Sequence, residues 1–271
     1  MEAPFDSTTT PMPAPRELIV AMSMAAAAGL VGSIAVMRRM ALASDALSHV
    51  ALPGVALAVL LHFDPLLGGV AALIVGTFLV WALEYRTRIP TEAVIGVLFS
   101  AALAIGTLMA SGEDLLEALL GNVAGSSTLD AVLGLTTAAL VIVFMIRARS
   151  RLVIRLVSSD LVHTLGVNVP RLDLLYLMAF ALTVALGLRY LGVLLMGSLI
   201  IIPATTGMHL GRSLRSMQLI AVTSAIGSTV LGTTLAPRLG VAAGPLIIVI
   251  AATAFFAGLF GRRRSPQRQR T

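Results

Sequence analysis

The sequence predicts an all-α polytopic membrane protein with eight or nine transmembrane helices. Of its 271 residues, 58% are hydrophobic and only 12% are charged, and the mean hydropathy of +0.97 is far above that of a soluble domain. Apolar runs close to the ~20 residues that cross a bilayer follow one another from Leu18 to Phe260. The breaks between them leave no room for a separate soluble domain, so residues 17–260 are predicted to form a single transmembrane domain.

Nine apolar segments are expected to be the membrane helices. They cover residues 17–37, 42–61, 65–83, 91–110, 129–147, 172–189, 193–209, 216–236 and 242–260. Merging the segment 42–61 with a neighbour would give eight helices instead of nine.

The arginines predict the orientation of these helices. All 19 basic residues are arginines, and no aromatic residues interleave with them as a nucleic-acid surface would require. The predicted inner loops hold Arg38, Arg39, Arg86, Arg88, Arg147, Arg149, Arg151, Arg155, Arg171, Arg212, Arg215, Arg262, Arg263, Arg264, Arg268 and Arg270, and the outer side holds Arg16, Arg189 and Arg238. Because basic loops stay in the cytosol, we expect a multi-pass protein of the plasma (inner) membrane, with its N-terminus outside and its C-terminus in the cytosol.

Two tails and one outer loop flank or interrupt the apolar segments. Residues 1–16 are polar and Pro-rich and lack the basic start of a signal peptide, which predicts a disordered external tail. Residues 261–271 form a basic cytosolic tail that either binds anionic lipid or holds the last helix in register. The outer loop 111–127 has leucines at the spacing of a short amphipathic helix on the membrane surface, although a plain connector is the alternative.

The longest cytosolic stretch covers residues 147–171, and its part at about 150–171 is the predicted coupling segment. Ser159 can cap a helix of about a turn and a half that Gly166 would end. A short helix held at the cytosolic face suits the docking of a soluble partner.

Asp45 and His49 bring an acid and an imidazole into an apolar segment. Residues four apart lie on the same face of a helix, so both side chains can meet one ligand. With Arg39 at the cytosolic edge and a rise of ~1.5 Å per residue, Asp45 lies ~9 Å and His49 ~15 Å into a hydrocarbon layer ~30 Å thick. Ionisable residues at that depth are candidates for function.

Pro53 adds a backbone ligand to this pair. Proline has no N–H to donate to the carbonyl of His49, so one helix face offers a carboxylate, an imidazole and a carbonyl oxygen. That mixture suits zinc, manganese or iron(II). The alternative is structural: the two side chains hydrogen-bond each other, or His49 is a satisfied buried imidazole.

Pro203 interrupts a second apolar run in the same way and is expected to free the carbonyl of Leu199. In the predicted topology this run is antiparallel to the segment 42–61. Paired, interrupted segments of opposite direction are typical of transport sites near the midplane.

Two missing residue types restrict the chemistry of the chain. Without lysine it cannot contain the P-loop GxxxxGK[ST], so an ATPase that drives transport would be a separate chain. Without cysteine it has no disulfide, thiolate metal site or Cys nucleophile. We therefore expect a transport subunit and not an enzyme.

Several stretches resemble the permease subunits of ABC importers for zinc, manganese and chelated iron. They are "RRMALASDALSHVALPGVALA" (38–58), "EAVIGVLFSAALAIG" (92–106), "ALLGN" (118–122), "VSSDLVHTLGVNVPRLDLL" (157–175) and "LGVLLMGSLIIIPATTG" (191–207). The resemblance implies a homodimer with ATPase subunits on the cytosolic side, which receives its metal from an external solute-binding protein.

The resemblance also implies roles for individual residues. The ion-pathway acid and histidine of the family correspond to Asp45 and His49, and its cytosolic coupling segment corresponds to residues Asp160 to Gly166, including Leu161. Ser44 departs from the family, which usually has glycine there. Two copies of the Asp45/His49 pair facing each other across a dimer axis would supply four protein ligands.

The function predicted from the sequence is therefore that of the permease subunit of an ATP-driven importer of divalent transition-metal ions (Zn, Mn or Fe), embedded in membrane lipid and without a permanently bound cofactor. The alternative is a proton-coupled secondary carrier that needs no ATPase. An intramembrane enzyme is disfavoured because the chain lacks HExxH. His62, near the predicted outer face, could also handle incoming ions.

Overall fold

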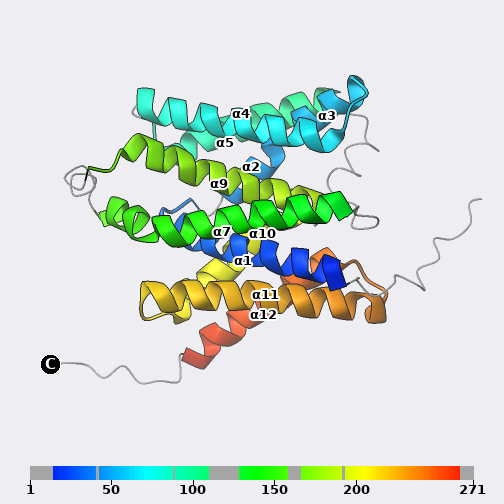
Figure 1. The fold of residues 1–271 in the computed structure, drawn as a ribbon, viewed down its shortest axis with the longest axis vertical. Coiled ribbons are helices and arrows are strands. Elements are labelled where there is room, and N and C mark those ends of the chain that lie inside the picture. Colours follow the sequence, from blue (N-terminus) through cyan, green and yellow to red (C-terminus); the bar gives the residue numbers. More distant parts are fainter. Residues whose placement is uncertain are drawn as a thin grey trace, which may run out of the picture.

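A computed structural model describes residues 15–40, 43–87, 89–109, 128–157, 166–190 and 193–262 of the chain. Its helices are α1 (Pro15–Met37), α2 (Ala43–Val50), α3 (Leu52–Leu60), α4 (Pro65–Arg86), α5 (Thr91–Met109), α7 (Thr128–Val157), α9 (Val169–Tyr190), α10 (Val193–Leu210), α11 (Leu214–Leu239) and α12 (Ala243–Arg262). Figure 1 shows α4, α9, α7, α1 and α11 stacked from top to bottom with their long axes roughly parallel, whereas α12 runs obliquely below them.

The all-α, polytopic prediction is confirmed. Seven of the described helices are long and apolar enough to cross a membrane, and two further apolar stretches, Ala46–Leu60 and Met196–Leu210, are shorter. Each of the nine predicted segments coincides with one helix, except that 42–61 forms the pair α2 and α3. The two short stretches are the ones that contain Pro53 and Pro203.

Helix α7 differs most from its predicted bounds. It continues to Val157, ten residues past the predicted end at 147, so the arginines from Arg147 to Arg155 lie on a helix and not in a loop. Residues 148–157 contain neither glycine nor proline, and arginine and leucine are good helix formers. Leu152 is fully buried, which shows that the packed face of α7 extends beyond the apolar run.

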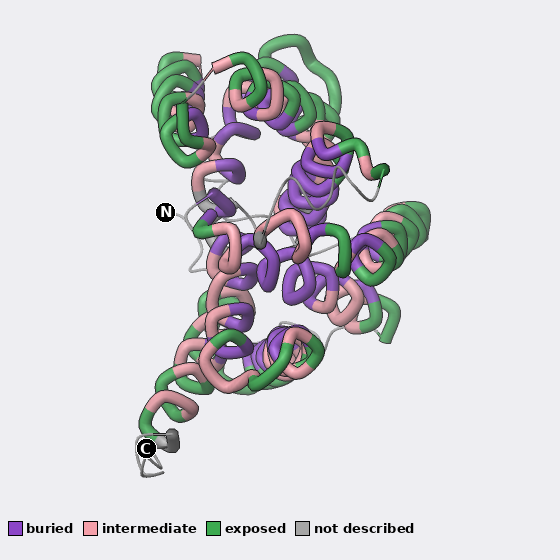
Figure 2. Tube along the Cα trace, turned by 90° about the vertical axis from the view of Figure 1, so that its left-hand side faces the viewer, coloured by how far each residue is buried: buried purple, intermediate pink, exposed green. Residues whose placement is uncertain are grey.

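Helix α1 lies at the centre of the molecule. It packs against α7, α9, α10 and α11, and eight of the eleven residues from Ala25 to Ala35 are alanine, glycine or serine. A Cβ on Gly32 would overlap the carbonyl oxygen of Ile200 in α10, so only glycine allows this close crossing. Figure 2, which looks along the helices, shows buried residues gathered in the middle and exposed ones on the outside, as expected where lipid surrounds the bundle.

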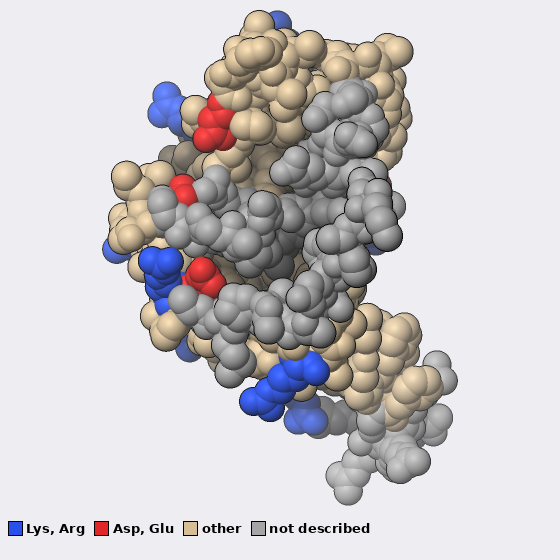
Figure 3. All heavy atoms as spheres, turned by 90° about the vertical axis from the view of Figure 1, so that its right-hand side faces the viewer, with Lys and Arg blue, Asp and Glu red and all other residues tan. Residues whose placement is uncertain are grey.

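The helix ends fall on two opposite sides. The C-terminal ends of α4, α7 and α12 and the N-terminal ends of α5 and α9 lie at the left of Figure 1. This side carries Arg86, Arg155 and Arg171 and is the predicted cytosolic one. Figure 3 shows the opposite side, where acidic residues stand beside scattered basic ones.

Several predicted features fall outside the described residues. They are most of the external tail, the amphipathic helix at 111–127, the capped helix after Ser159 and most of the basic tail. The first helix begins at Pro15, two residues inside the stretch predicted to be tail.

Candidate metal site

Helix α2 is surrounded by protein. It contacts α4, α5, α9 and α10 and lies near the middle of the stack in Figure 1. Ala43 packs with Val80 of α4, Ile95 of α5 and Leu177 of α9, and Leu47 is also buried. Two polar residues of this helix, Ser44 and Ser48, are also buried.

His49 is half-buried one residue before the end of α2. Its ring packs edge-on against Phe99 of α5, with ring centroids 5.3 Å apart. Its Nδ1 atom is buried, and no hydrogen-bond partner for it lies within the described part of the chain. A buried ring nitrogen without a partner requires an explanation, such as a water molecule or an ion.

Asp45 belongs to the same helix, four residues before His49. This spacing in one unbroken helix places the two residues on the same face. The Asp45 side chain itself lies outside the described part of the chain.

The helix ends directly after His49, as the position of Pro53 predicts. α2 stops at Val50 and α3 starts at Leu52, with the proline in its first turn. The Ala51 amide donates to the carbonyl of Ser48 at 3.3 Å, and the Val55 amide to that of Ala51 at 3.0 Å. Since Pro53 has no N–H, the carbonyl of His49 receives no helical bond from it.

The packing around this break is tight. A Cβ on Gly54 of α3 would overlap the carbonyl oxygen of Gly68 in α4, and a Cβ on Gly68 would overlap that of Gly54. On the other side, the position of a Cβ on Gly106 of α5 lies 3.1 Å from the Cβ of Leu52. The break is thus held between two helices at close range.

The second proline does not interrupt its helix, contrary to the prediction. α10 runs through Pro203 to Leu210 without a break. The hydroxyl of Thr205 donates to the carbonyls of Ile201 and Ile202, and that of Thr206 to Ile202. These bonds do not reach the carbonyl of Leu199, which is the one that Pro203 leaves without a helical donor. α10 packs against α1, α11 and α12, and neighbouring helices allow membrane helices to tolerate proline.

The two proline-containing segments nevertheless lie together. α2 packs against α10, and the buried Ser44 hydroxyl lies 3.4 Å from the carbonyl oxygen of Gly197. A glycine at position 44 could not make this contact, so Ser44 adds a polar link between α2 and α10.

The remaining predicted residues lie elsewhere. His62, at the far end of α3, is exposed with φ 58°, and its Nδ1 lies 3.2 Å from the carbonyl oxygen of Val59. Close to it in the chain, Asp64, which is not one of the predicted site residues, caps α4 by accepting from the Leu66 amide at 2.8 Å. Asp160 and Leu161 lie outside the described residues, and Gly166 is in a left-handed turn with φ 68° just before α9.

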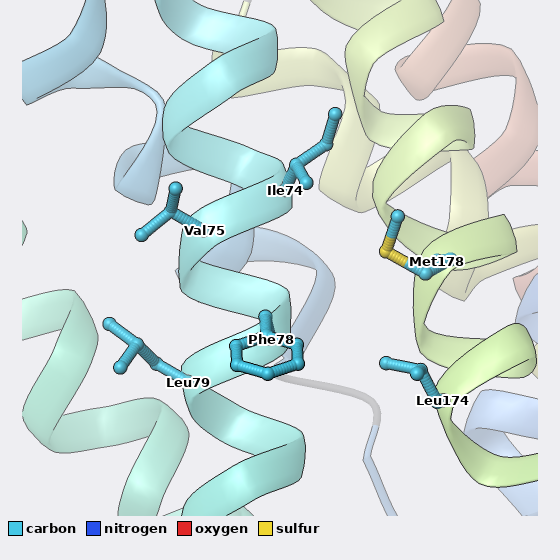
Figure 4. Close-up of a pocket in the computed structure, with 6 residues that line it drawn as sticks. All are labelled: Ile74, Val75, Phe78, Leu79, Leu174 and Met178. Carbon is cyan, nitrogen blue, oxygen red and sulfur yellow. The ribbon is translucent and has the colours of Figure 1, made fainter. Parts of the chain in front are cut away.

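No group of three or more metal-binding side chains is found among the described residues. An apolar groove of about 320 Å³ lies between α4 and α9. Figure 4 shows Ile74 and Phe78 of α4 pointing towards Met178 and Leu174 of α9. The groove is lined only by apolar residues and offers a cation no oxygen or nitrogen ligand, so it is not the metal site.

One buried charge was not predicted from the sequence. Asp173 of α9 is buried and bonds to Arg38, Tyr85 and Arg155. The acid stands second in the predicted segment 172–189, next to a polar break, which is the usual place for an interfacial residue. The available signal in the sequence was an acid two residues after Arg171, at the edge of an apolar run.

Comparisons with known proteins agree over most of the chain. The model of the ABC 3 transport family matches residues 14–262. The manganese import system permease protein ScaB of Streptococcus gordonii is 28% identical over 247 residues, covering 90% of this chain and 89% of that protein. The high-affinity zinc uptake system membrane protein ZnuB of Haemophilus influenzae is 30% identical over 239 residues, covering 86% and 91%. PsaBC from Streptococcus pneumoniae in complex with Fab has a similar structure, with a TM-score of 0.77, 27% identity and 90% of both chains covered.

Proposed function

The chain belongs to the ABC 3 transport family, and from this membership we propose that it is the permease subunit of an ATP-driven importer of a divalent transition-metal ion. Relatives that align over nearly their whole length are named for manganese import and for zinc uptake. Imidazole and carboxylate are suitable ligands for zinc, manganese and iron(II), and we propose one of these three ions as the cargo.

The ion passes Asp45 and His49 on α2. The observation that carries this proposal is the buried Nδ1 of His49, which has no partner in the described part of the chain. The atom lies inside the helix bundle, one turn after a carboxylate residue and directly before a helix break. A divalent cation would satisfy this nitrogen, while Phe99 limits the orientations of the ring.

A single copy supplies an incomplete ligand set, which suits a transport site because the ion must also leave. The Asp45/His49 pair and the carbonyl of His49 offer fewer ligands than the four of a closed zinc site. A homodimer with the two pairs facing each other would complete the set at one stage of the cycle.

Energy comes from outside this polypeptide. The chain has no lysine and so no P-loop; ATP is hydrolysed by a separate subunit that docks near Asp160, Leu161 and Gly166. An external solute-binding protein delivers the ion on the opposite side. ATP binding shifts the cytosolic segment between α7 and α9, and this switches access to the site on α2.

The test is metal uptake by cells that depend on this protein. His49→Ala and Asp45→Ala should each abolish manganese- or zinc-dependent growth and uptake while the protein remains in the membrane, because each removes one of very few ligands. His62→Asn is the matched control: it deletes an exposed imidazole from the same segment, and asparagine tolerates the positive φ. Uptake should stay at the wild-type level in this control, because His62 is exposed after the end of α3 and not on α2. A loss of uptake would instead support a role of His62 in handling incoming ions.

Wild-type uptake by either α2 variant would refute the proposed site. Vesicles that contain the chain without an ATPase should take up no metal. Uptake by the lone chain under a proton gradient would instead identify a proton-coupled carrier.

A further inference from the structure

Asp173 joins four helices at the predicted cytosolic side. Among the described residues it is the only charged one that is buried, with 1% of its surface exposed. One carboxylate oxygen accepts from the guanidinium of Arg38, and the other accepts from the Tyr85 hydroxyl at 2.7 Å and from Nε of Arg155 at 3.3 Å. These partners lie just after α1, at the end of α4 and at the end of α7.

The Arg38 side of this cluster is fixed further. Its guanidinium carbon lies 4.5 Å from the centre of the Tyr176 ring, a cation–π geometry. Tyr176 is fully buried and donates its hydroxyl to the carbonyl of Val31 at 3.3 Å. Arg38 therefore contacts α9 in two ways: through its ion pair with Asp173 and through the stacking of its guanidinium on the Tyr176 ring.

The positions of these residues in the chain suggest what the cluster does. Arg155 lies three residues before the stretch 158–165, and Asp173 follows that stretch by eight residues. Arg38 lies five residues before the start of α2. The Asp173 carboxylate thus connects α7 and α9, which flank the predicted ATPase-docking stretch, to the junction between α1 and α2. Helix α2 carries Asp45 and His49.

We propose that Asp173 is a positioning residue. It transmits the conformational change that ATP binding produces at the ends of α7 and α9 to the junction between α1 and α2. This inference rests on the proposed function. A buried carboxylate with two guanidinium partners is costly to break, so these helix ends move as one body. A shift of α7 and α9 then displaces Arg38, and with it the start of α2.

A structural role alone would not predict a loss of coupling. If Asp173 only stabilised the fold, its replacement would lower the folded yield, and the molecules that remained would transport normally. If it transmits the conformational change, its replacement lowers the amount of metal moved for each ATP hydrolysed. The ratio of transport to hydrolysis separates the two roles.

The experiment uses the permease purified with its ATPase subunits and reconstituted into vesicles, with Mn²⁺ or Zn²⁺ as the probe. Asp173→Asn keeps the shape and the Tyr85 contact but removes the charge. We expect the metal moved per ATP to fall by about tenfold, while ATP hydrolysis continues. Asp64→Asn makes the same chemical change at an exposed cap, where asparagine also caps well, and should leave the ratio unchanged.

Arg155→Gln is a second variant for the same measurement, to be used if the complex with Asp173→Asn fails to assemble. Its side chain is 30% exposed and makes the longest of the three contacts, so the variant should fold and lose only the link to α7. We expect its ratio to fall about fivefold.

An unchanged ratio in the assembled variants, with the wild-type complex transporting metal, would overturn this inference alone. A wild-type complex that moves no metal would overturn the proposed function and the inference with it.

Discussion

At the scale of single residues, Gly54 packs so closely against the backbone of α4 that no side chain fits at its position. It faces Gly68 across the crossing of α3 and α4, and a Cβ on either glycine would overlap the carbonyl oxygen of the other. Gly54→Ala must push the two helices apart, so we expect it to lower the free energy of unfolding by about 1–3 kcal/mol, as overpacked cores do. Thermal unfolding of the purified protein measures this.

The matched control is Gly96→Ala. Gly96 lies in α5, and a Cβ there would meet nothing within 4 Å. Alanine is a better helix former than glycine by up to about 1 kcal/mol, so the control should keep or raise the unfolding temperature. Equal effects of the two substitutions would show that the crossing is looser than its geometry indicates.

The polar residues divide into those that the sequence could reveal and those that it could not. Asp45 and His49 stand out because they interrupt an apolar run at the spacing of one helical turn. Asp173 stands at the edge of its run, and its partners Arg155, Tyr85 and Arg38 are 18, 88 and 135 residues away. Local pattern predicts a shared helix face, but it does not predict which helix ends meet.

At the scale of elements, two prolines in similar apolar runs have different consequences. α2 and α3 separate just before Pro53, whereas α10 continues through Pro203. α10 is packed against α1, α11 and α12, which hold it in place on its neighbours although Pro203 donates no bond to the carbonyl of Leu199. The sequence therefore predicts that a backbone bond is lost at each proline, and the surrounding groups decide whether the helix ends there.

This difference predicts that two matched proline-to-alanine substitutions affect metal uptake differently. Pro53→Ala supplies an N–H that can donate to the carbonyl of His49, so α2 and α3 should join and that carbonyl should be lost as a ligand. We expect metal uptake to fall by about tenfold or more without loss of stability. Pro203→Ala acts in a helix that is already continuous and should change uptake by about twofold at most.

Uptake assays and circular dichroism of the purified variants measure both effects. Equal uptake by Pro53→Ala and the wild type would show that the break does not contribute to the ion pathway.

At the scale of the whole molecule, the order of the helices along the chain was predictable, but their neighbours were not. Length and hydropathy define the nine apolar segments, because each must cover a hydrocarbon layer of similar thickness. In lipid the apolar faces do not select partners, and close packing of small residues does. The central place of α1 follows from contacts such as that of Gly32 with Ile200, which no periodicity indicates.

The orientation of the molecule follows from its arginines, and two of them test it directly. Arg212 and Arg238 are both exposed and lie at opposite ends of α11, with Arg212 predicted in the cytosol and Arg238 outside. The chain has no cysteine, so Arg212→Cys and Arg238→Cys each create a single thiol without background. Each variant removes one arginine of 19, which leaves the bias that orients the chain in place.

A membrane-impermeant maleimide should label Arg238→Cys in intact cells, and Arg212→Cys only after the membrane is permeabilised. Labelling of Arg212→Cys alone in intact cells would reverse the orientation. It would also move the coupling segment and the Asp173 cluster to the outer side, where no ATPase can reach them. Labelling of both in intact cells would mean that α11 does not cross the membrane, although its 26 residues are long and apolar enough to do so.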